Sequence, residues 1–392
     1  MLFRSVLLTV FLSVWSNLPA NASIQSTVPV RDVRVPNGGI QPQALVDPTG
    51  RIHLLYYSGD PAHGDLYYVT STDEGQTWSR PLRVNSRAGA AVALGTIRGG
   101  QLAFGRNRRV YVVWNGSSET ERDGPLNPES GKQGMPLLYT RLNDASNAFE
   151  PERNLMTHTF GLDGGAAITA DNAGDVYVAW HGKAPGALQG EAGRQVWVTR
   201  STDDGKTFKA ERPATHDQTG ACGCCGMAMY SASNGDVYAL YRSATEDVHR
   251  DIYLLTSADR GSTFSDRELH PWNINACPMS SMSFAEQQTK VEGAWETGGQ
   301  VYFENVANRN AKPISAPGPN KGHKHPRIAI APNGDTLLVW TEGTGWGKGG
   351  SLGWQAYDSA GTPLSEHGAL AGLPAWSFAA VVSTRNGFLI LY

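Results

Sequence analysis

Apolar and polar residues alternate along this chain in short runs that come in pairs. Six segments share one form, which is a run of alternating apolar residues, a turn rich in Gly, Asn or Asp, and a second apolar run. Residues 44–57 (ALVDPTGRIHLLYY) and 166–180 (AAITADNAGDVYVAW) are two of them. A period of two predicts strands with a buried face, and the Gly/Asn turn predicts a hairpin. Residues 281–306 contain a looser seventh copy, and almost no stretch has a helical period.

The repetition itself predicts the architecture. Four-stranded units repeated around a closed ring form a β-propeller, so we expect a single all-β domain over residues 23–392. The count favours seven blades, or six if the looser copy is not a full blade. The last unit supplies only two strands before Tyr392, and residues 24–36 are expected to add an outer strand that closes the ring.

A second repeat, S-x-D-x-G-x-T-[WF], follows a strand at residues 71–78, 201–208 and 257–264, with a decayed copy at 143–151. The Asp can accept hydrogen bonds from its own turn, the Gly supplies a positive φ, and the aromatic residue buries a large apolar surface. We therefore expect a structural rather than a catalytic role. The residues concerned are Asp73, Gly75, Trp78, Asp203, Gly205, Phe208, Asp259, Gly261 and Phe264.

The N-terminal segment predicts export. Arg4 precedes an apolar run from Val6 to Trp15, and Ala20 and Ala22 are the small residues expected before a cleavage site. Residues 1–22 therefore read as a signal peptide of a secreted or periplasmic protein. The run is shorter than the roughly 20 residues that span a bilayer, and no later segment is apolar enough to do so. A net charge of −3 excludes the basic surface of a nucleic-acid binder.

The second repeat resembles the Asp box, or BNR repeat, of the sialidase (neuraminidase) superfamily. The resemblance implies a propeller, six-bladed in that family, with the boxes at the rim away from the active site. It implies an exo-α-sialidase-like glycoside hydrolase if the protein is active, and a glycan or another small anionic ligand. Such an enzyme clamps the substrate carboxylate with three arginines and uses a Tyr nucleophile paired with a Glu.

The chain departs from that catalytic pattern. Gln41 or Gln43 stands where the resemblance places the first arginine, in GIQPQALV. Arg327 is a candidate for one clamp position and Asp60 for the general acid, whereas no Tyr–Glu pair can be assigned. The ordinary sialidase site is therefore predicted to be incomplete.

The openings of the innermost strands line one mouth of a propeller channel, and the sequence places unusual residues there. Unit four opens with Cys222, Cys224 and Cys225, in TGACGCCGMAMY, and unit five opens with Cys277. All four cysteines are thus expected at adjacent positions of the mouth. Further candidates for ligand binding at the mouth are Asp163, His325 and Trp346.

Three interpretations of the cysteines stay open. An even number of cysteines in an exported protein suits two disulfides. Thiolates, with His325 as a further ligand, suit copper or zinc. A catalytic thiol would need a lowered pKa. Two functions follow: a glycan-binding or glycosidase-like propeller with an incomplete site, or a non-catalytic propeller that binds a metal, a glycan or a protein partner at its mouth.

Overall fold

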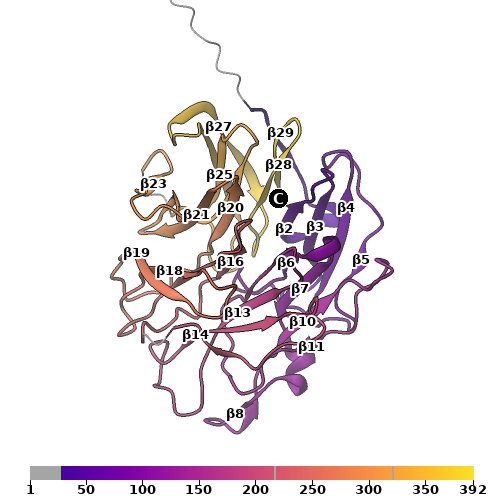
Figure 1. The fold of residues 1–392 in the computed structure, drawn as a ribbon, viewed down its shortest axis with the longest axis vertical. Coiled ribbons are helices and arrows are strands. Elements are labelled where there is room, and N and C mark those ends of the chain that lie inside the picture. The colour runs from indigo at the N-terminus through magenta and orange to yellow at the C-terminus, as the bar shows by residue number, and fades with distance from the viewer. Residues whose placement is uncertain (1–27, 216–217, 320–321) are drawn as a thin grey trace, which may run out of the picture.

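The computed structural model describes residues 28–215, 218–319 and 322–392, and the predicted signal peptide lies outside these residues. Seven β-sheets surround a central channel in sequence order (Figure 1). In Figure 1 the chain runs round the ring, from indigo on the right, through magenta and orange, to yellow at the top. The fold is a seven-bladed β-propeller, which confirms the all-β prediction and the count of seven.

Each blade runs from its innermost strand at the channel to its outermost strand. Blade 1 contains β2 (Ile40–Val46), β3 (Ile52–Ser58), β4 (Asp65–Ser71) and β5 (Leu82–Arg83). Blade 2 contains β6 (Gln101–Phe104), β7 (Val110–Asn115), β10 (Leu137–Arg141) and β11 (Arg153–Asn154). Blade 3 contains β12 (Ala167–Ala170), β13 (Val176–Gly182), β14 (Gln195–Ser201) and β15 (Arg212–Pro213). Blade 4 contains β16 (Ala228–Ser231), β17 (Val237–Arg242), β18 (Ile252–Ser257) and β19 (Ser265–His270).

The last three blades continue the pattern. Blade 5 contains β20 (Ser283–Gln287), β21 (Lys290–Thr297), β22 (Gln300–Asn305) and β23 (Ile314–Ser315). Blade 6 contains β24 (Lys324–Ile330), β25 (Thr336–Glu342), β26 (Gly350–Tyr357) and β27 (Pro363–Leu373). Blade 7 contains β28 (Ala380–Thr384), β29 (Gly387–Leu391) and β1 (Val30–Val33). Outside the blades are β8 (Leu126–Asn127), β9 (Lys132–Gln133) and the 3₁₀ turns η1 (Pro36–Gly38), η2 (Arg106–Arg108) and η3 (Ser118–Asp123).

The two ends of the chain close the ring. Strand β1 pairs in parallel with β29, with Val30 opposite Phe388 and Val33 opposite Leu391. The inner strands β2 and β28 then lie side by side, so blade 7 contacts blade 1. The N-terminal segment therefore adds the outer strand that the sequence predicted. Blade 7 therefore has three strands within the described residues, two from the last unit and one from the N-terminal segment.

The Asp boxes close the turns between third and outermost strands. In the copy at residues 201–208, Asp203 Oδ1 accepts hydrogen bonds from Ser201 Oγ at 2.7 Å and from the Thr207 amide at 2.9 Å. Burial opposes ionisation of Asp203, but these hydrogen bonds lower its pKa to about 2. Gly205 has a φ of 72°, and a side chain there would collide with Tyr139 of the preceding blade. The turn thus also sets the contact between neighbouring blades.

A Glu-Arg pair at the start of the outermost strand links the blades in a way that the sequence analysis missed. The side chain of Glu211 accepts hydrogen bonds from the amides of Thr157, His158 and Thr159 at 2.8–3.0 Å. Arg212 reaches forward and donates to the Gly261 carbonyl in the next Asp box at 2.6 Å. Glu152 and Arg153 repeat both contacts one blade earlier, with the Ser86 amide and the Gly205 carbonyl. The dipeptide recurs at 152–153 and 211–212, which is the signal that could have revealed it.

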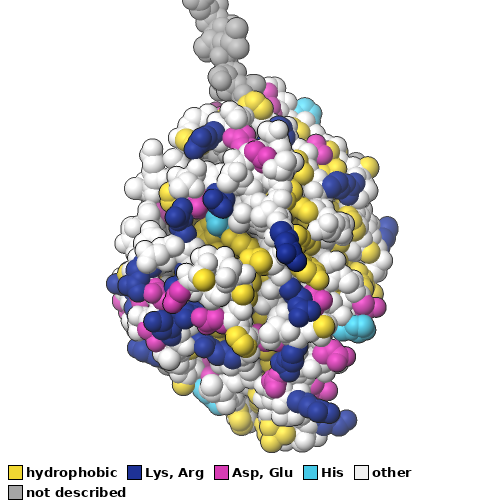
Figure 2. All heavy atoms as spheres, turned by 90° about the vertical axis from the view of Figure 1, so that its right-hand side faces the viewer, with side chains coloured by type: hydrophobic (Ala, Val, Ile, Leu, Met, Phe, Trp, Pro, Cys, Tyr) yellow, Lys and Arg dark blue, Asp and Glu magenta, His cyan; other side chains and the backbone are white. Residues whose placement is uncertain are grey.

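No helix in the described part of the chain is long and apolar enough to cross a membrane. On the face shown in Figure 2, Lys and Arg side chains are interspersed with Asp and Glu and do not merge into one basic surface. This mixed surface agrees with the small net charge of the sequence.

Candidate functional site

The channel mouth carries unusual backbone geometry. Gln41, Met279, His325 and Trp376, at or just before the start of four inner strands, have φ values between 49° and 61°. Residues other than glycine rarely adopt this left-handed conformation, and such strain is concentrated at functional sites. The strained backbone therefore makes the mouth the candidate functional site.

The cysteine loop of blade 4 is fixed to three neighbouring segments. The Cys222 amide donates to the Arg242 carbonyl at 2.9 Å, and the Gly226 amide donates to the Ser280 carbonyl of the blade 5 opening, also at 2.9 Å. The Gly223 amide donates to Glu191 Oε1 at 2.7 Å. These contacts hold the loop in one conformation, so its side chains are positioned before any ligand arrives.

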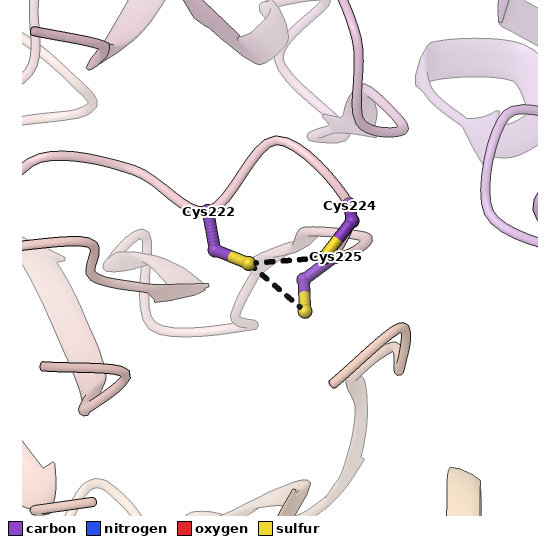
Figure 3. A group of neighbouring side chains, drawn as sticks. All are labelled: Cys222, Cys224 and Cys225. Carbon is purple, nitrogen blue, oxygen red and sulfur yellow. Dashed lines mark hydrogen bonds between the residues drawn. The ribbon is translucent and has the colours of Figure 1, made fainter. Parts of the chain in front are cut away.

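Three sulfurs converge inside this loop (Figure 3). Cys222 Sγ lies 3.3 Å from Cys224 Sγ and 3.5 Å from Cys225 Sγ, and all three lie within 4.8 Å of one another. Cys222 and Cys225 are fully buried, whereas Cys224 is partly exposed. Thiolates bound tetrahedrally to one ion at about 2.3 Å would lie about 3.8 Å apart. The three sulfurs are therefore spaced closely enough to share one ion.

Cys277 reaches the same place from blade 5. Its sulfur, Cys224 Sγ and a carboxylate oxygen of Glu191 lie within 4.8 Å of one another. Cys277 is exposed, and all four cysteines are free thiols in the structure. Cys224 therefore belongs both to the buried thiol group and to a second, more exposed group.

Two buried arginines lie near the thiols, and each is paired with a carboxylate. The buried Arg242 side chain lies on the blade 4 side, where it pairs with Glu296 at 2.9 Å, and Arg250 pairs with Glu191 at 2.6 Å. Burial would raise the pKa of Cys225, but hydrogen bonds from Cys222 and Cys224 and the charge of Arg242 hold it well below its usual range. Hydrogen bonds to Cys222 and Cys225 raise the pKa of Cys224. The hydrogen bond to Cys224 lowers the pKa of Cys222, but its hydrogen bond to Cys225 and burial outweigh this effect and raise it. The group therefore favours one thiolate, on Cys225, while the raised pKa values of Cys222 and Cys224 favour their protonated forms.

His181 is a neighbour that the sequence analysis did not identify. It lies at the end of β13 and is fully buried, and neither ring nitrogen has a hydrogen-bond partner among the residues that the structure describes. A side chain built on Gly164 would lie 2.8 Å from His181 Nδ1 and 2.6 Å from the Cys225 carbonyl, so the imidazole backs onto the cysteine loop. Burial lowers the pKa of His181 to about 4, and the ring is neutral. Its position at a strand end is not readable from a lone His in the sequence.

Gln41 and Asp163, predicted as ligand-binding residues, form contacts within the mouth. Gln41 Nε2 donates to the carbonyls of Ala93 and Trp376 at 2.7 and 2.8 Å, which joins blades 1, 2 and 7. Asp163 accepts a hydrogen bond from Arg98 and lies 3.7 Å from Arg194. The side-chain N–H groups of Gln41 therefore already donate to backbone carbonyls of the protein.

Trp346 and His325 line one small hollow at the mouth. Trp346 is 61% exposed and packs edge to face on Trp376, with ring centroids 4.8 Å apart. Lys324 and Met279 also line this hollow. His325 itself is buried, its Nδ1 lies 3.2 Å from Ser281 Oγ, and burial lowers its pKa to about 3. It is not among the groups that share an ion with the cysteines in the described residues.

The two residues predicted to be catalytic lie in different settings. Asp60 is exposed in the loop after β3, where Oδ1 accepts the Ala62 amide at 2.8 Å. Arg327 is buried in the wall of the central channel, together with Gln43. No cavity of the described residues contains both Asp60 and Arg327.

A Tyr–Glu pair, which the sequence left unassigned, does occur. Tyr230 donates to Glu286 at 3.1 Å between the inner strands of blades 4 and 5. Burial raises the pKa of Tyr230, and Glu286 also accepts from the Ser233 amide and hydroxyl in the turn that follows β16. This turn lies at the opposite end of β16 from the cysteine loop, so the pair is not part of the mouth.

No family model and no curated protein matches this sequence. Solved structures do share its fold. A protein of unknown function from Dyadobacter fermentans aligns over 86% of this chain and 94% of its own, with 15% identity and a TM-score of 0.51. The Hadza microbial sialidase Hz136 aligns over 78% of this chain, with 11% identity and a TM-score of 0.52. Trypanosoma rangeli sialidase aligns over 79%, with 12% identity and a TM-score of 0.53.

The chain spans 64% and 53% of the lengths of these two sialidases. At such low identity the similarity concerns the fold alone. The chain is thus a sialidase-like β-propeller, as the Asp boxes indicated.

Proposed function

We propose that this protein is an exported, non-catalytic propeller that binds a thiophilic metal ion at its channel mouth. The observation that carries the proposal is the convergence of three cysteine sulfurs within 4.8 Å of one another. Thiolate ligands select soft ions such as Cu(I) and Zn(II). Arg242 and Arg250, each also paired with a carboxylate, lie close enough to interact electrostatically with the thiolates of such a site.

The number of ligands favours Cu(I) over Zn(II). Structural zinc sites are almost always four-coordinate. Among the described residues, no fourth Cys, His, Asp or Glu lies within reach of all three sulfurs, because Cys277 and Glu191 approach only Cys224. Cys222, Cys224 and Cys225 therefore act as the ligands, and Cys277 stands at the entrance.

A competition titration tests this function. Reduced protein is titrated with Cu(I) in the presence of a chromophoric Cu(I) chelator, and the same titration is made with Zn(II). We expect one tightly bound Cu(I) per chain, at least 100-fold weaker binding in Cys222→Ser and Cys225→Ser, and a smaller loss in Cys277→Ser, because Cys277 lies outside the buried group. Equal affinity in all four proteins would refute the proposal.

Export rests on residues 1–22 and is tested separately. Expression of the full chain in a bacterium with a periplasm should yield mature protein beginning at Ser23, which N-terminal sequencing detects. Retention of Met1 on protein found in the cytoplasm would refute export. The thiol site would then operate in a reducing compartment.

Glycan binding is a second candidate, favoured by the exposed Trp346 beside Trp376. Exposed aromatic rings can stack on sugar rings, and Lys324 in the same hollow suits an anionic sugar. We expect no hydrolysis of a fluorogenic sialoside, because Gln41 or Gln43 stands where the family resemblance places the first arginine. Binding to a glycan array that is lost in Trp346→Ala and kept in Leu188→Ala, an equally exposed apolar residue, would support this candidate. Turnover of the sialoside would refute the incomplete site.

A further inference from the structure

The central channel contains a buried positive charge without a partner. The Arg327 side chain projects from β24, and burial lowers its pKa to about 10 with no contribution from any carboxylate. Within the described residues no Asp or Glu oxygen pairs with Arg327, and its Nη1 donates instead to Ser281 Oγ, the Met282 carbonyl and the Pro326 carbonyl at 3.1–3.2 Å. Its guanidinium stacks over Phe378 at 4.3 Å. These contacts orient the group but do not neutralise it.

Besides Arg327, the channel contains two side chains, Gln43 and Ser283, whose buried polar atoms lack partners among the described residues. Arg327 Nε and Gln43 Nε2 are both buried donors without an acceptor in the described parts of the chain, and both residues line one cavity of about 140 Å³. The hydroxyl of Ser283 is also unpartnered and lines this cavity. The remaining wall comes from the inner strands of all seven blades and is mixed, with Leu45, Leu102 and Val381 beside Gln101 and Tyr230.

Burying an unpaired cation is costly, and proteins normally compensate the charge. Water molecules in the cavity would satisfy the donors but would not neutralise Arg327. A small anion would do both, because it accepts hydrogen bonds from Arg327 Nε, Gln43 Nε2 and Ser283 Oγ and cancels the charge. We propose that the channel holds a resident small inorganic anion, of the halide or nitrate class, between Arg327 and Gln43. This site is separate from the cysteine loop at the mouth.

Bound anion makes the folded protein more stable by mass action. Thermal unfolding is therefore measured in sodium chloride, bromide and nitrate against sodium gluconate at equal ionic strength, since gluconate is too bulky for the cavity. We expect the melting temperature to rise saturably with each small anion in the wild type and in Arg309→Met, which removes an exposed arginine. Arg327→Met should lose this dependence. In gluconate it should melt higher than the wild type, because methionine removes the uncompensated charge while filling similar space.

A second measurement covers the case in which Arg327→Met does not fold. Crystals of the wild type grown in bromide should show an anomalous peak within hydrogen-bond distance of Arg327 Nε and Gln43 Nε2. Equal melting temperatures in chloride and gluconate would overturn the proposal. So would a channel that contains only water in bromide-grown crystals.

Discussion

Glu211 offers a sharp test of how the blades are held together. Its side chain is fully buried and accepts five hydrogen bonds from residues 157–159, three from backbone amides and two from the hydroxyls of Thr157 and Thr159. Burial opposes its ionisation, but the hydrogen bonds from His158 and Thr157 outweigh burial and lower its pKa from 4.5 to about 2. At about 1.4 kcal/mol per pKa unit, the ionised form contributes about 3 kcal/mol to stability at neutral pH.

Glu211→Gln removes this charge while keeping the shape of the side chain. We expect a loss of about 2–3 kcal/mol in the free energy of unfolding at pH 7, because one amide oxygen replaces two charged acceptors. The control is Glu129→Gln, at an exposed glutamate, which should change stability by less than about 0.5 kcal/mol. Urea unfolding followed by tryptophan fluorescence measures both.

The pH dependence has a definite sign. A carboxyl whose pKa is lowered by folding stabilises the protein above its unfolded pKa and loses that effect as the pH falls toward the folded value. The difference between wild type and Glu211→Gln should therefore be constant above pH 5.5 and shrink by about 1 kcal/mol by pH 3.5. A difference below about 0.5 kcal/mol at pH 7, or one that does not shrink in acid, would refute the reasoning.

Three further predictions concern the turns, the buried imidazoles and the mouth. Gly205→Ala should destabilise the protein by about 1–3 kcal/mol more than Gly235→Ala in thermal unfolding, because both glycines have positive φ but only a methyl group at 205 meets Tyr139. His325, whose pKa burial lowers to about 3, is neutral when folded. The protein should thus lose on the order of 1–2 kcal/mol between pH 6.5 and pH 5 through this residue, and His325→Gln should reduce that loss. Trp346→Ala should leave the melting temperature within about 1 °C, since the ring is 61% exposed, while removing any glycan binding.

The sequence was sufficient to predict the architecture, because each repeated segment corresponds to part of one blade. Each strand–turn–strand unit gave two inner strands of a blade, and the Asp box gave the turn after the third. The outermost strands were not predictable from pattern, since β5, β11, β15 and β23 have two residues each, too few to show a period. Blade 7 has three strands because β1 alone, from the N-terminal segment, completes it.

The sequence predicted which site residues lie close together only where two neighbouring blades are also consecutive in the chain. The openings of blades 4 and 5 follow one another in sequence, so Cys224 and Cys277 could be expected near each other. The contacts of Arg327 and His181 depend on which way each side chain points at a strand end, and a shift of one residue reverses that direction. The channel position of Arg327 and its separation from Asp60 therefore required the structure.

We propose that the cysteines at the mouth bind a metal ion and do not form disulfides. Intact mass and metal content, measured on protein purified without reductant from an oxidising compartment, distinguish these two states of the cysteines. We predict a mass with all four thiols intact after removal of the metal, and close to one copper ion per chain before it. A mass about four hydrogens lower, with no metal bound, would mean two disulfides and would contradict the claim.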